Sequence, residues 1–235
     1  PGRNVGIMAT NAHFGQKKHE RMTWAVGMFR ETDDGAEVES DQGYNVTGRV
    51  TCLPVYLEEG RKLVHIGTAY SYRVPNDDEM LRYRSRPEAH WIGTRFVDTG
   101  DFAADDVNLF GAEAAVVWGP FSVQSEFISA VTDNVLGADD GCFTGWYVQG
   151  SYFITGEHRK YKNAAGAFDR VEPNRNFDGK GNGWGAWEVA CRYSFLDLDE
   201  DNVAQSWHGE LHDVTLGMNW YLNPNAKIML NYGLA

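Results

Sequence analysis

The stretch from Asp213 to Tyr232 constrains the fold more than any other part of the chain, because large apolar side chains alternate with polar or small ones. The turn sequence Asn223-Pro224-Asn225 separates two such runs. This pattern predicts a β-hairpin with one apolar face and one polar face. A water-soluble sandwich and a membrane barrel both carry such hairpins. The apolar face comprises Val214, Leu216, Met218, Trp220, Leu222, Ile228, Leu230, Tyr232 and Leu234.

The same period of two recurs along the whole chain and indicates an all-β, antiparallel fold. No segment with helical periodicity and convincing length competes with it. No linker divides the chain, so we expect a single domain over residues 1–235. About eleven strands are predicted, near residues 4–11, 22–31, 44–53, 62–73, 80–86, 107–118, 121–131, 143–155, 185–197, 211–222 and 226–234.

The choice between a sandwich and a barrel depends on whether water or lipid surrounds the sheet. So large a sheet must close or stack, because its open edges would otherwise aggregate. Apolar runs fall far short of the ~20 residues of a membrane helix, but a barrel strand crosses a membrane with ~10 alternating residues. A transmembrane barrel is favoured because short turns mix with long acidic loops, charges lie on the opposite faces, and the apolar faces are rich in aromatic residues. These residues are Trp24, Tyr70, Tyr72, Trp146, Tyr152, Trp187, Tyr193 and Trp220.

Five segments in the same order resemble the carboxy-terminal half of the phosphate-selective porin O and P family. A further segment, SRPEAHWIGTRFVDTG (85–100), is similar as well, and residues 1–80 fit more loosely. The five are GAEAAVVWGPFSVQSEF (111–127), FTGWYVQGSYFITGEHRKY (143–161), GAFDRVEPN (166–174), WGAWEVACRYSFLDLD (184–199) and DVTLGMNWYLNPNAKIMLNY (213–232).

The resemblance implies a passive porin for small anions such as phosphate, in the outer membrane of a Gram-negative-type cell. It also implies sixteen strands, a homotrimer, and contact with the bilayer and outer-membrane lipids. The chain departs from this pattern in two ways. About eleven strands are visible, and the last residue, Ala235, is not the aromatic residue on which such barrels usually end. The start, PGRNVGIMAT, lacks the features of a signal peptide. The chain is then either a fragment, incomplete at both ends, or a reduced relative of the family, and a fragment is favoured.

If the aromatic faces meet lipid, the opposite faces line a lumen whose charges can be counted separately. Six arginines then point inward against Glu113, Glu126 and Glu188, although the whole chain carries a formal charge of −12. Residues two apart on a strand lie ~6.6 Å apart on one face, so the run RYRSR (82–86) would form a ladder along one wall. Guanidinium suits such anion sites because it stays charged and offers several donors. The predicted pore-lining residues are Arg82, Arg84, Arg86, Arg49, Arg73 and Arg192.

A competing interpretation is that these arginines pair with the inward carboxylates and stiffen the lumen. A separate alternative is a structural barrel that anchors another assembly and conducts little, which would be favoured if residues 87–106 and 156–184 folded inward and closed the lumen. Strict up-and-down parity places the long segment 156–184 at the end that carries the short turns.

The remaining motifs indicate no enzyme, cofactor, metal site or nucleic-acid partner. His208, Glu210 and His212 are spaced like metal ligands but lack a fourth ligand, so a surface loop end is favoured. An outer-membrane enzyme would need Ser125 or Ser129 to have a histidine neighbour, and none is evident. The basic residues Arg159, Lys160 and Lys162 are interpreted as a solvated loop, and Cys52, Cys142 and Cys191 have no metal spacing and cannot all pair.

Overall fold

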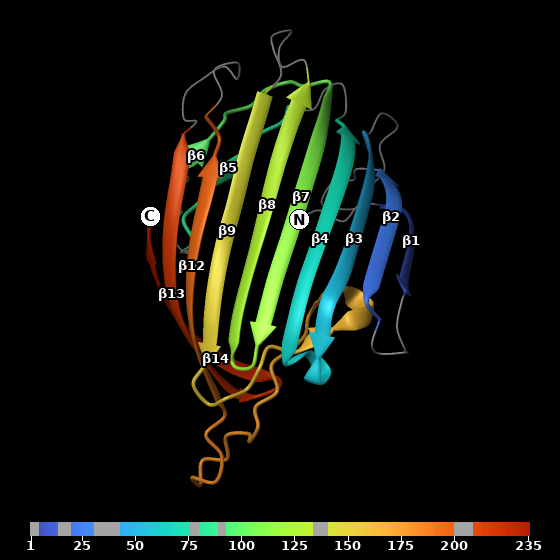
Figure 1. Ribbon diagram of the computed structural model, residues 1–235. Helices are drawn as coiled ribbons and strands as arrows, with labels where there is room; N and C mark the ends of the chain where they lie inside the picture. The colour runs from blue at the N-terminus through green and yellow to red at the C-terminus, as the bar shows by residue number, and fades with distance from the viewer. Residues whose placement is uncertain are drawn as a thin grey trace.

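The chain forms one large antiparallel sheet of ten strands, shown by a computed structural model that describes residues 5–13, 20–30, 43–75, 80–88, 93–133, 141–199 and 209–235. Each strand of this wall pairs with the strand that precedes it in the wall (Figure 1). The strands are β1 (Val5–His13), β2 (Met22–Arg30), β3 (Tyr44–Leu57), β4 (Lys62–Val74), β7 (Asp106–Trp118), β8 (Phe121–Asp133), β9 (Gly141–Phe153), β12 (Ala186–Asp197), β13 (Glu210–Asn223) and β14 (Ala226–Leu234).

The all-β antiparallel prediction is confirmed, and ten of the eleven predicted strands lie in the wall. The exception is the segment predicted over residues 80–86, because β4 pairs directly with β7 and leaves no place between them. The sheet is not closed, and within the described residues β1 and β14 each have a neighbour on one side only. No helix in the described ranges is long and apolar enough to cross a membrane.

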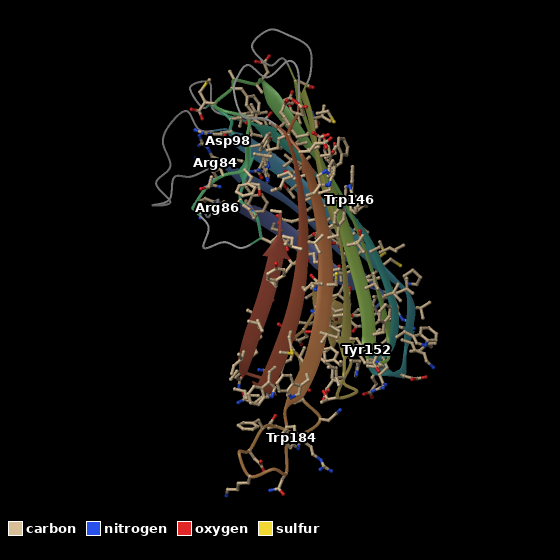
Figure 2. The ribbon with its side chains drawn as sticks, turned by 90° about the vertical axis from the view of Figure 1, so that its left-hand side faces the viewer. Arg84, Arg86, Asp98, Trp146, Tyr152 and Trp184 are labelled. Carbon is tan, nitrogen blue, oxygen red and sulfur yellow. The ribbon has the colours of Figure 1, made fainter. Side chains whose placement is uncertain are left out.

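The two faces of the wall differ as the alternation predicts. The convex face exposes large apolar side chains, among them Trp146, Tyr152 and Leu216. Figure 2 shows Trp146 and Tyr152 on the side of the sheet opposite to Arg84 and Arg86. The strand period of two therefore places apolar groups outside and polar groups inside along the length of the sheet.

The connections differ between the two ends of the wall. Tight turns at 58–61, 119–120 and 224–225 lie at the lower end in Figure 1, and the connection between β4 and β7 lies at the upper end. The connection between β9 and β12, residues 154–185, also lies at the lower end. Its position agrees with the strict up-and-down parity of the sequence.

Two connections fold back against the concave face and cover the buried apolar side chains of the wall. The upper segment, residues 80–88 and 93–105, contains the short hairpin β5 (Arg84–Ser85) and β6 (Val97–Asp98). Its Val97 and Phe102 are buried against Val107, Phe143 and Leu211 of the wall. Apolar burial thus fixes the upper segment inside the curve of the sheet.

The lower segment, residues 154–185, packs on the opposite end of the same face. It contains β10 (Tyr161–Lys162), a 3-10 turn (Asn163–Ala165) and β11 (Ala167–Phe168). Tyr161 and Phe168 pack on a buried cluster of Leu53, Leu63 and Val117. The turn ends at Gly166, whose φ of 59° is left-handed, and a Cβ there would lie 2.7 Å from two wall threonine oxygens. Only glycine fits this close approach to the wall.

Candidate functional site: the concave face and the upper segment

Two inward-facing arginines of the wall, Arg49 and Arg192, are paired with carboxylates. Arg49 Nη2 lies 2.6 Å from Glu113 Oε1, and Arg192 Nε lies 2.6 Å from Oε1 of Glu88 in the upper segment. The sequence placed Arg49, Arg192 and Glu113 on the inward faces, and these contacts agree with that placement. It did not identify Glu88, because that residue lies outside every predicted strand. The pairing corresponds to the competing, structural interpretation of these arginines.

A polar network fastens the lower segment to β3, β4 and β7. Arg49 donates to the carbonyl oxygen of Gly166 at 2.9 Å as well as to Glu113. Tyr161 and His65 Nδ1 are 2.6 Å apart, and His65 Nε2 lies 3.2 Å from Glu113. A His65 tautomer with its proton on Nε2 satisfies both contacts, with the Tyr161 hydroxyl as donor to Nδ1. Burial raises the pKa of Tyr161, so this hydroxyl keeps its proton.

The carboxylate of Glu113 fits in the wall because its neighbour on β4 is glycine. A Cβ on Gly67 would lie 2.3 Å from Glu113 Oε1. Gly67 and Glu113 are paired in the β4–β7 register, so the missing side chain leaves the space that the carboxylate fills. An alanine at position 67 would displace the acceptor that Arg49 and His65 share.

A second polar network fastens the lower segment to β12 and β13. Arg159 Nη2 lies 2.7 Å from Oε1 of Glu188, whose side chain is 0% exposed. Oε2 of Glu188 accepts hydrogen bonds from Asn219 Nδ2 at 2.9 Å and from the Tyr221 hydroxyl at 2.8 Å. The buried charge is thus paired and hydrogen-bonded, as burial requires. Arg159, predicted as part of a solvated loop, instead has a side chain only 18% exposed.

The guanidinium of Arg192 lies between an acid and an aromatic ring. Its Cζ lies 3.7 Å from the centre of the Tyr147 ring, and the Tyr147 hydroxyl donates to Glu126 at 2.6 Å. Arg192, Tyr147 and Glu126 come from β12, β9 and β8, which are neighbours in the wall. With Glu88 they form a chain of contacts across the concave face. The positive charge of Arg192 therefore has both a counter-ion and a cation–π partner.

The three arginines of the RYRSR run lie on the upper segment and not on a wall strand, which corrects the predicted ladder along one wall. Only Arg84 and Ser85 of this run are in a strand, and that strand pairs with β6 inside the curve of the sheet. The run was misassigned because its alternation resembles that of the wall strands. Its partner is a two-residue strand that no periodicity reveals.

Arg82 is separated from the other two arginines by its pairing. Its Nε and Nη2 both lie 2.7 Å from the carboxylate oxygens of Asp98, and Nη1 lies 3.4 Å from Asp101. This bidentate contact holds the pKa of Asp98 below its usual range, with partial desolvation opposing the effect. Within the described residues, Arg84 and Arg86 have no ion pair.

Arg95 joins Arg84 and Arg86, and sequence reasoning missed it. Partial desolvation and the positive charges of Arg84 and Arg86 lower the pKa of Arg95. Arg95 lies outside every predicted strand, so the alternation of the sequence did not identify it. Arg73 is exposed on the inward face of β4, where its Nε lies 3.4 Å from Ser71 Oγ. Arg84, Arg86 and Arg95 thus bring three guanidiniums together on the upper segment.

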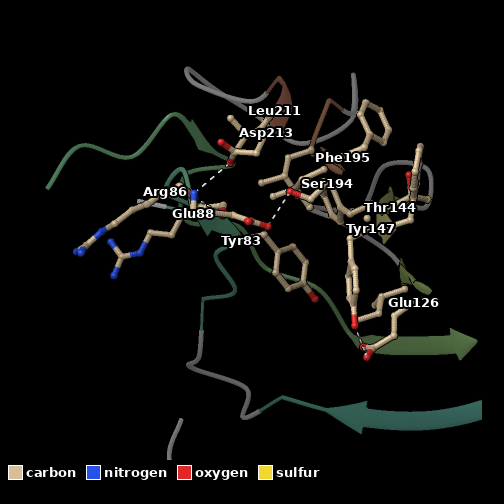
Figure 3. A pocket seen from close by; sticks show the side chains of 18 of the residues that line it. Tyr83, Arg86, Glu88, Glu126, Thr144, Tyr147, Ser194, Phe195, Leu211 and Asp213 are labelled. Atoms are coloured by element: carbon tan, nitrogen blue, oxygen red, sulfur yellow. Dashed lines mark hydrogen bonds between the residues drawn. The ribbon is translucent and has the colours of Figure 1, made fainter. Parts of the chain in front are cut away.

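A cavity of about 730 Å³ lies between the upper segment and the wall. Figure 3 shows Arg86 at its edge, and Glu88 and Glu126 reaching it from different sides. Polar and charged groups line one part, and apolar groups of the wall line the rest. Its lining includes Tyr83, Arg84, Arg86, Glu88, Leu109, Glu126, Ile128, Tyr147, Arg192 and Asp213.

The other candidate motifs do not form a second centre. His212 contacts the Tyr193 hydroxyl at 2.8 Å and lies 3.5 Å from Glu210, while His208 falls outside the described residues. No group of three potential metal ligands occurs within the described residues. Ser125 donates to the Tyr147 carbonyl oxygen and Ser129 contacts Cys142, so neither contacts a histidine. Cys52, Cys142 and Cys191 are free thiols.

An antiparallel wall with an apolar outer face and a charged inner face is that of a transmembrane β-barrel protein of the porin class. Residues 7–235 match the profile of the phosphate-selective porin O and P family, and the chain belongs to that family. It is therefore an outer-membrane protein, in agreement with the resemblance seen in the sequence.

Two relatives illustrate the match. Porin O of Pseudomonas aeruginosa is 31% identical over 241 residues, which cover 88% of this chain and 51% of the relative. An uncharacterized protein of Caulobacter vibrioides is 28% identical over 245 residues, covering 99% of this chain and 46% of the relative. The chain thus spans about half the length of the curated relatives it matches.

Proposed function

We propose that the protein is a passive outer-membrane channel for small anions such as phosphate. One observation carries the proposal: Arg84 and Arg86 line a cavity of about 730 Å³ on the inner face and have no carboxylate partner within the described residues. Guanidiniums that keep their charge and their free donors bind phosphate and carboxylate groups well. The family assignment supports a channel and not an enzyme.

The predicted pore-lining set divides into two groups. Arg84, Arg86 and Arg73 have no carboxylate partner within the described residues and are proposed as anion-binding residues, together with Arg95. The guanidiniums of Arg49, Arg82 and Arg192 lie against carboxylates. They are proposed to line the pore and to hold the inward-folded segments in place. The ion then meets its binding groups at the upper end of the lumen.

The test is single-channel recording of the full-length protein in a planar bilayer under a KCl gradient, with and without phosphate. We expect an anion-selective current that phosphate blocks. The double substitution Arg84→Gln/Arg86→Gln should lower anion preference and raise the half-blocking phosphate concentration by at least about tenfold, since each charge-assisted hydrogen bond contributes about 1.5–3 kcal/mol.

The matched control is Arg175→Gln/Lys180→Gln, which removes the same charge from the exposed part of the lower segment. It should leave the block unchanged. Unaltered selectivity and block in the Arg84/Arg86 variant would refute the anion site.

A structural barrel that anchors another assembly is the second candidate, and the inward folding of both long segments favours it. The absence of any current in the same bilayer recording would decide for it. Cation selectivity would instead mean that the lumen carboxylates dominate.

We also propose that residues 1–235 belong to one barrel domain that is incomplete at both ends. The proposal is supported by two observations: the chain spans about half the length of its relatives, and β1 and β14 each have a neighbour on one side only within the described residues. A homotrimer, expected from the family resemblance, is proposed for the whole protein. Light scattering of the detergent-solubilised protein would refute it by giving a monomer mass.

A further inference from the structure

Glu88 of the upper segment contacts the wall through both its side chain and its backbone. Its Oε1 lies 2.6 Å from Arg192 Nε and accepts a hydrogen bond from Ser194 Oγ at 3.0 Å. Its Oε2 accepts from Thr215 Oγ1 at 2.8 Å, and its backbone N–H donates to Asp213 Oδ2 at 3.2 Å. Figure 3 shows the contacts to Asp213 and Ser194. One residue therefore joins the upper segment to both β12 and β13.

The four wall groups form one small patch. Arg192 pairs with Thr215 in the β12–β13 register, and Ser194 pairs with Asp213. The patch is part of a regular sheet, so its side chains hold fixed spacings whatever the upper segment does. A carboxylate that accepts two side-chain hydrogen bonds and forms an ion pair on such a patch holds its own backbone in place.

Only one residue, Pro87, separates Glu88 from Arg86. Pro87 is buried, and its ring fixes one backbone angle of the link between the two. Because this link is short and constrained, fixing the backbone of Glu88 also fixes the backbone of Arg86. Arg84 lies two residues further along, in β5, which pairs with β6.

Glu88 also determines how much positive charge the lumen presents. Its carboxylate is the ion-pair partner of Arg192, whose guanidinium also lies over the Tyr147 ring and interacts electrostatically with Asp213. Arg192 lines the same cavity as Arg84 and Arg86, so without Glu88 the net positive charge at this cavity would rise by one. The same side chain therefore affects both the placement and the number of charges.

We propose that Glu88 is a positioning and selectivity-determining residue, which anchors the anion-binding segment to the wall and cancels the charge of Arg192. The inference rests on the proposed function for its effect on selectivity. Its anchoring part rests on the contacts alone.

Two substitutions separate the two roles. Glu88→Gln keeps an oxygen acceptor for Ser194 or Thr215 but removes the counter-charge of Arg192. We expect the anion-to-cation permeability ratio to rise about threefold to fivefold, the size of one screened charge a few ångströms from the permeating ion. Glu88→Ala removes the anchor as well, and phosphate block should weaken by about tenfold.

Amide hydrogen exchange of residues 80–88 in the full-length protein gives a readout that does not depend on conduction. Glu88→Ala should speed this exchange by about tenfold, and Glu88→Gln should change it much less. Glu210→Gln is the matched control, since it removes an exposed carboxylate at the same end of the wall. It should alter neither exchange nor selectivity.

Each outcome decides one part. Unchanged exchange in Glu88→Ala would overturn the anchor, and an unchanged permeability ratio in Glu88→Gln of an anion-selective channel would overturn the charge role. A wild-type channel without anion preference would instead refute the proposed function, and with it the selectivity role, while the exchange experiment still decides the anchor.

Discussion

At the scale of residues, the inward-facing arginines divide into those that are paired with a carboxylate and those that are proposed to bind anions. Arg49, Arg192 and Arg159 each lie within 2.7 Å of a carboxylate. The contacts of Arg192 and Arg159 join an inward segment to the wall, and the contact of Arg49 joins β3 to β7 across β4. Arg84 and Arg86 have no such carboxylate in the described part of the chain. Counting inward charges along a strand cannot separate these two groups, because pairing depends on residues far away in sequence.

Glu188, the partner of Arg159, offers the sharpest test of whether the paired arginines stabilise the structure. Glu188→Ala leaves Arg159 without a counter-ion in a buried place, which is expected to lower the free energy of unfolding by about 3 kcal/mol. Urea unfolding of the full-length protein in detergent micelles measures this. Glu210→Ala, at an exposed position on β13, should change it by less than about 0.5 kcal/mol. Equal effects of the two substitutions would mean that the buried pair contributes nothing specific.

Sequence parity predicted the inward faces of Arg49, Arg73, Arg192, Glu113 and Glu188, because a strand period of two leaves a side chain no third direction. It did not predict Glu88 or Arg95, which lie in a connection without periodicity. Nor did it separate Arg82 from Arg84 and Arg86, since the bond to Asp98 depends on the fold of the connection.

At the scale of elements, the wall strands and the inward segments follow different rules. Each wall strand carries its own alternation, so ten of them were visible in the sequence. The short strands β5, β6, β10 and β11 have two residues each and form only because their side chains pack on the wall. Long connections are thus predicted poorly even where the strands on both sides are predicted well.

The lower segment is the element whose removal should change conduction most directly. Replacing residues 157–171 with a Gly-Ser linker of equal length removes Arg159, Tyr161 and Gly166 from the wall. We expect a larger single-channel conductance and a wall that still folds, because the segment fills the lower part of the concave face. The same recording serves as the measurement.

A matched control replaces residues 178–181, which are exposed and lie outside the cluster around Leu63. Its conductance should equal that of the wild type. An unchanged conductance for the 157–171 variant would mean that the lower segment does not narrow the path of the ions.

At the scale of the whole molecule, the two faces of the sheet separate two solvents. Val148 points outward from β9 and is 41% exposed, and its neighbour Gln149 points inward. An arginine in the lipid-facing position must bring its charge into hydrocarbon, whereas an arginine in the lumen remains in water. Adjacent residues should therefore respond in opposite ways to the same change.

Val148→Arg is expected to lower the free energy of unfolding from lipid vesicles by about 2–4 kcal/mol. Gln149→Arg should change it by less than about 1 kcal/mol. Urea titrations of both variants in vesicles of one composition measure the difference. Similar losses in both variants would contradict the assignment of the two faces.

The inward segments also bear on the order in which the molecule forms. Each wall strand pairs with the next wall strand along the chain, whereas Glu88 meets Thr215 across 127 residues and Asn163 meets Glu20 across 143. Contacts of such length close large loops, and they form after local ones. The two segments therefore dock last, onto strands already paired. Substitutions that remove their anchoring contacts, such as those of Glu88 and Asn163, should then speed unfolding and hardly change the rate at which the wall strands assemble.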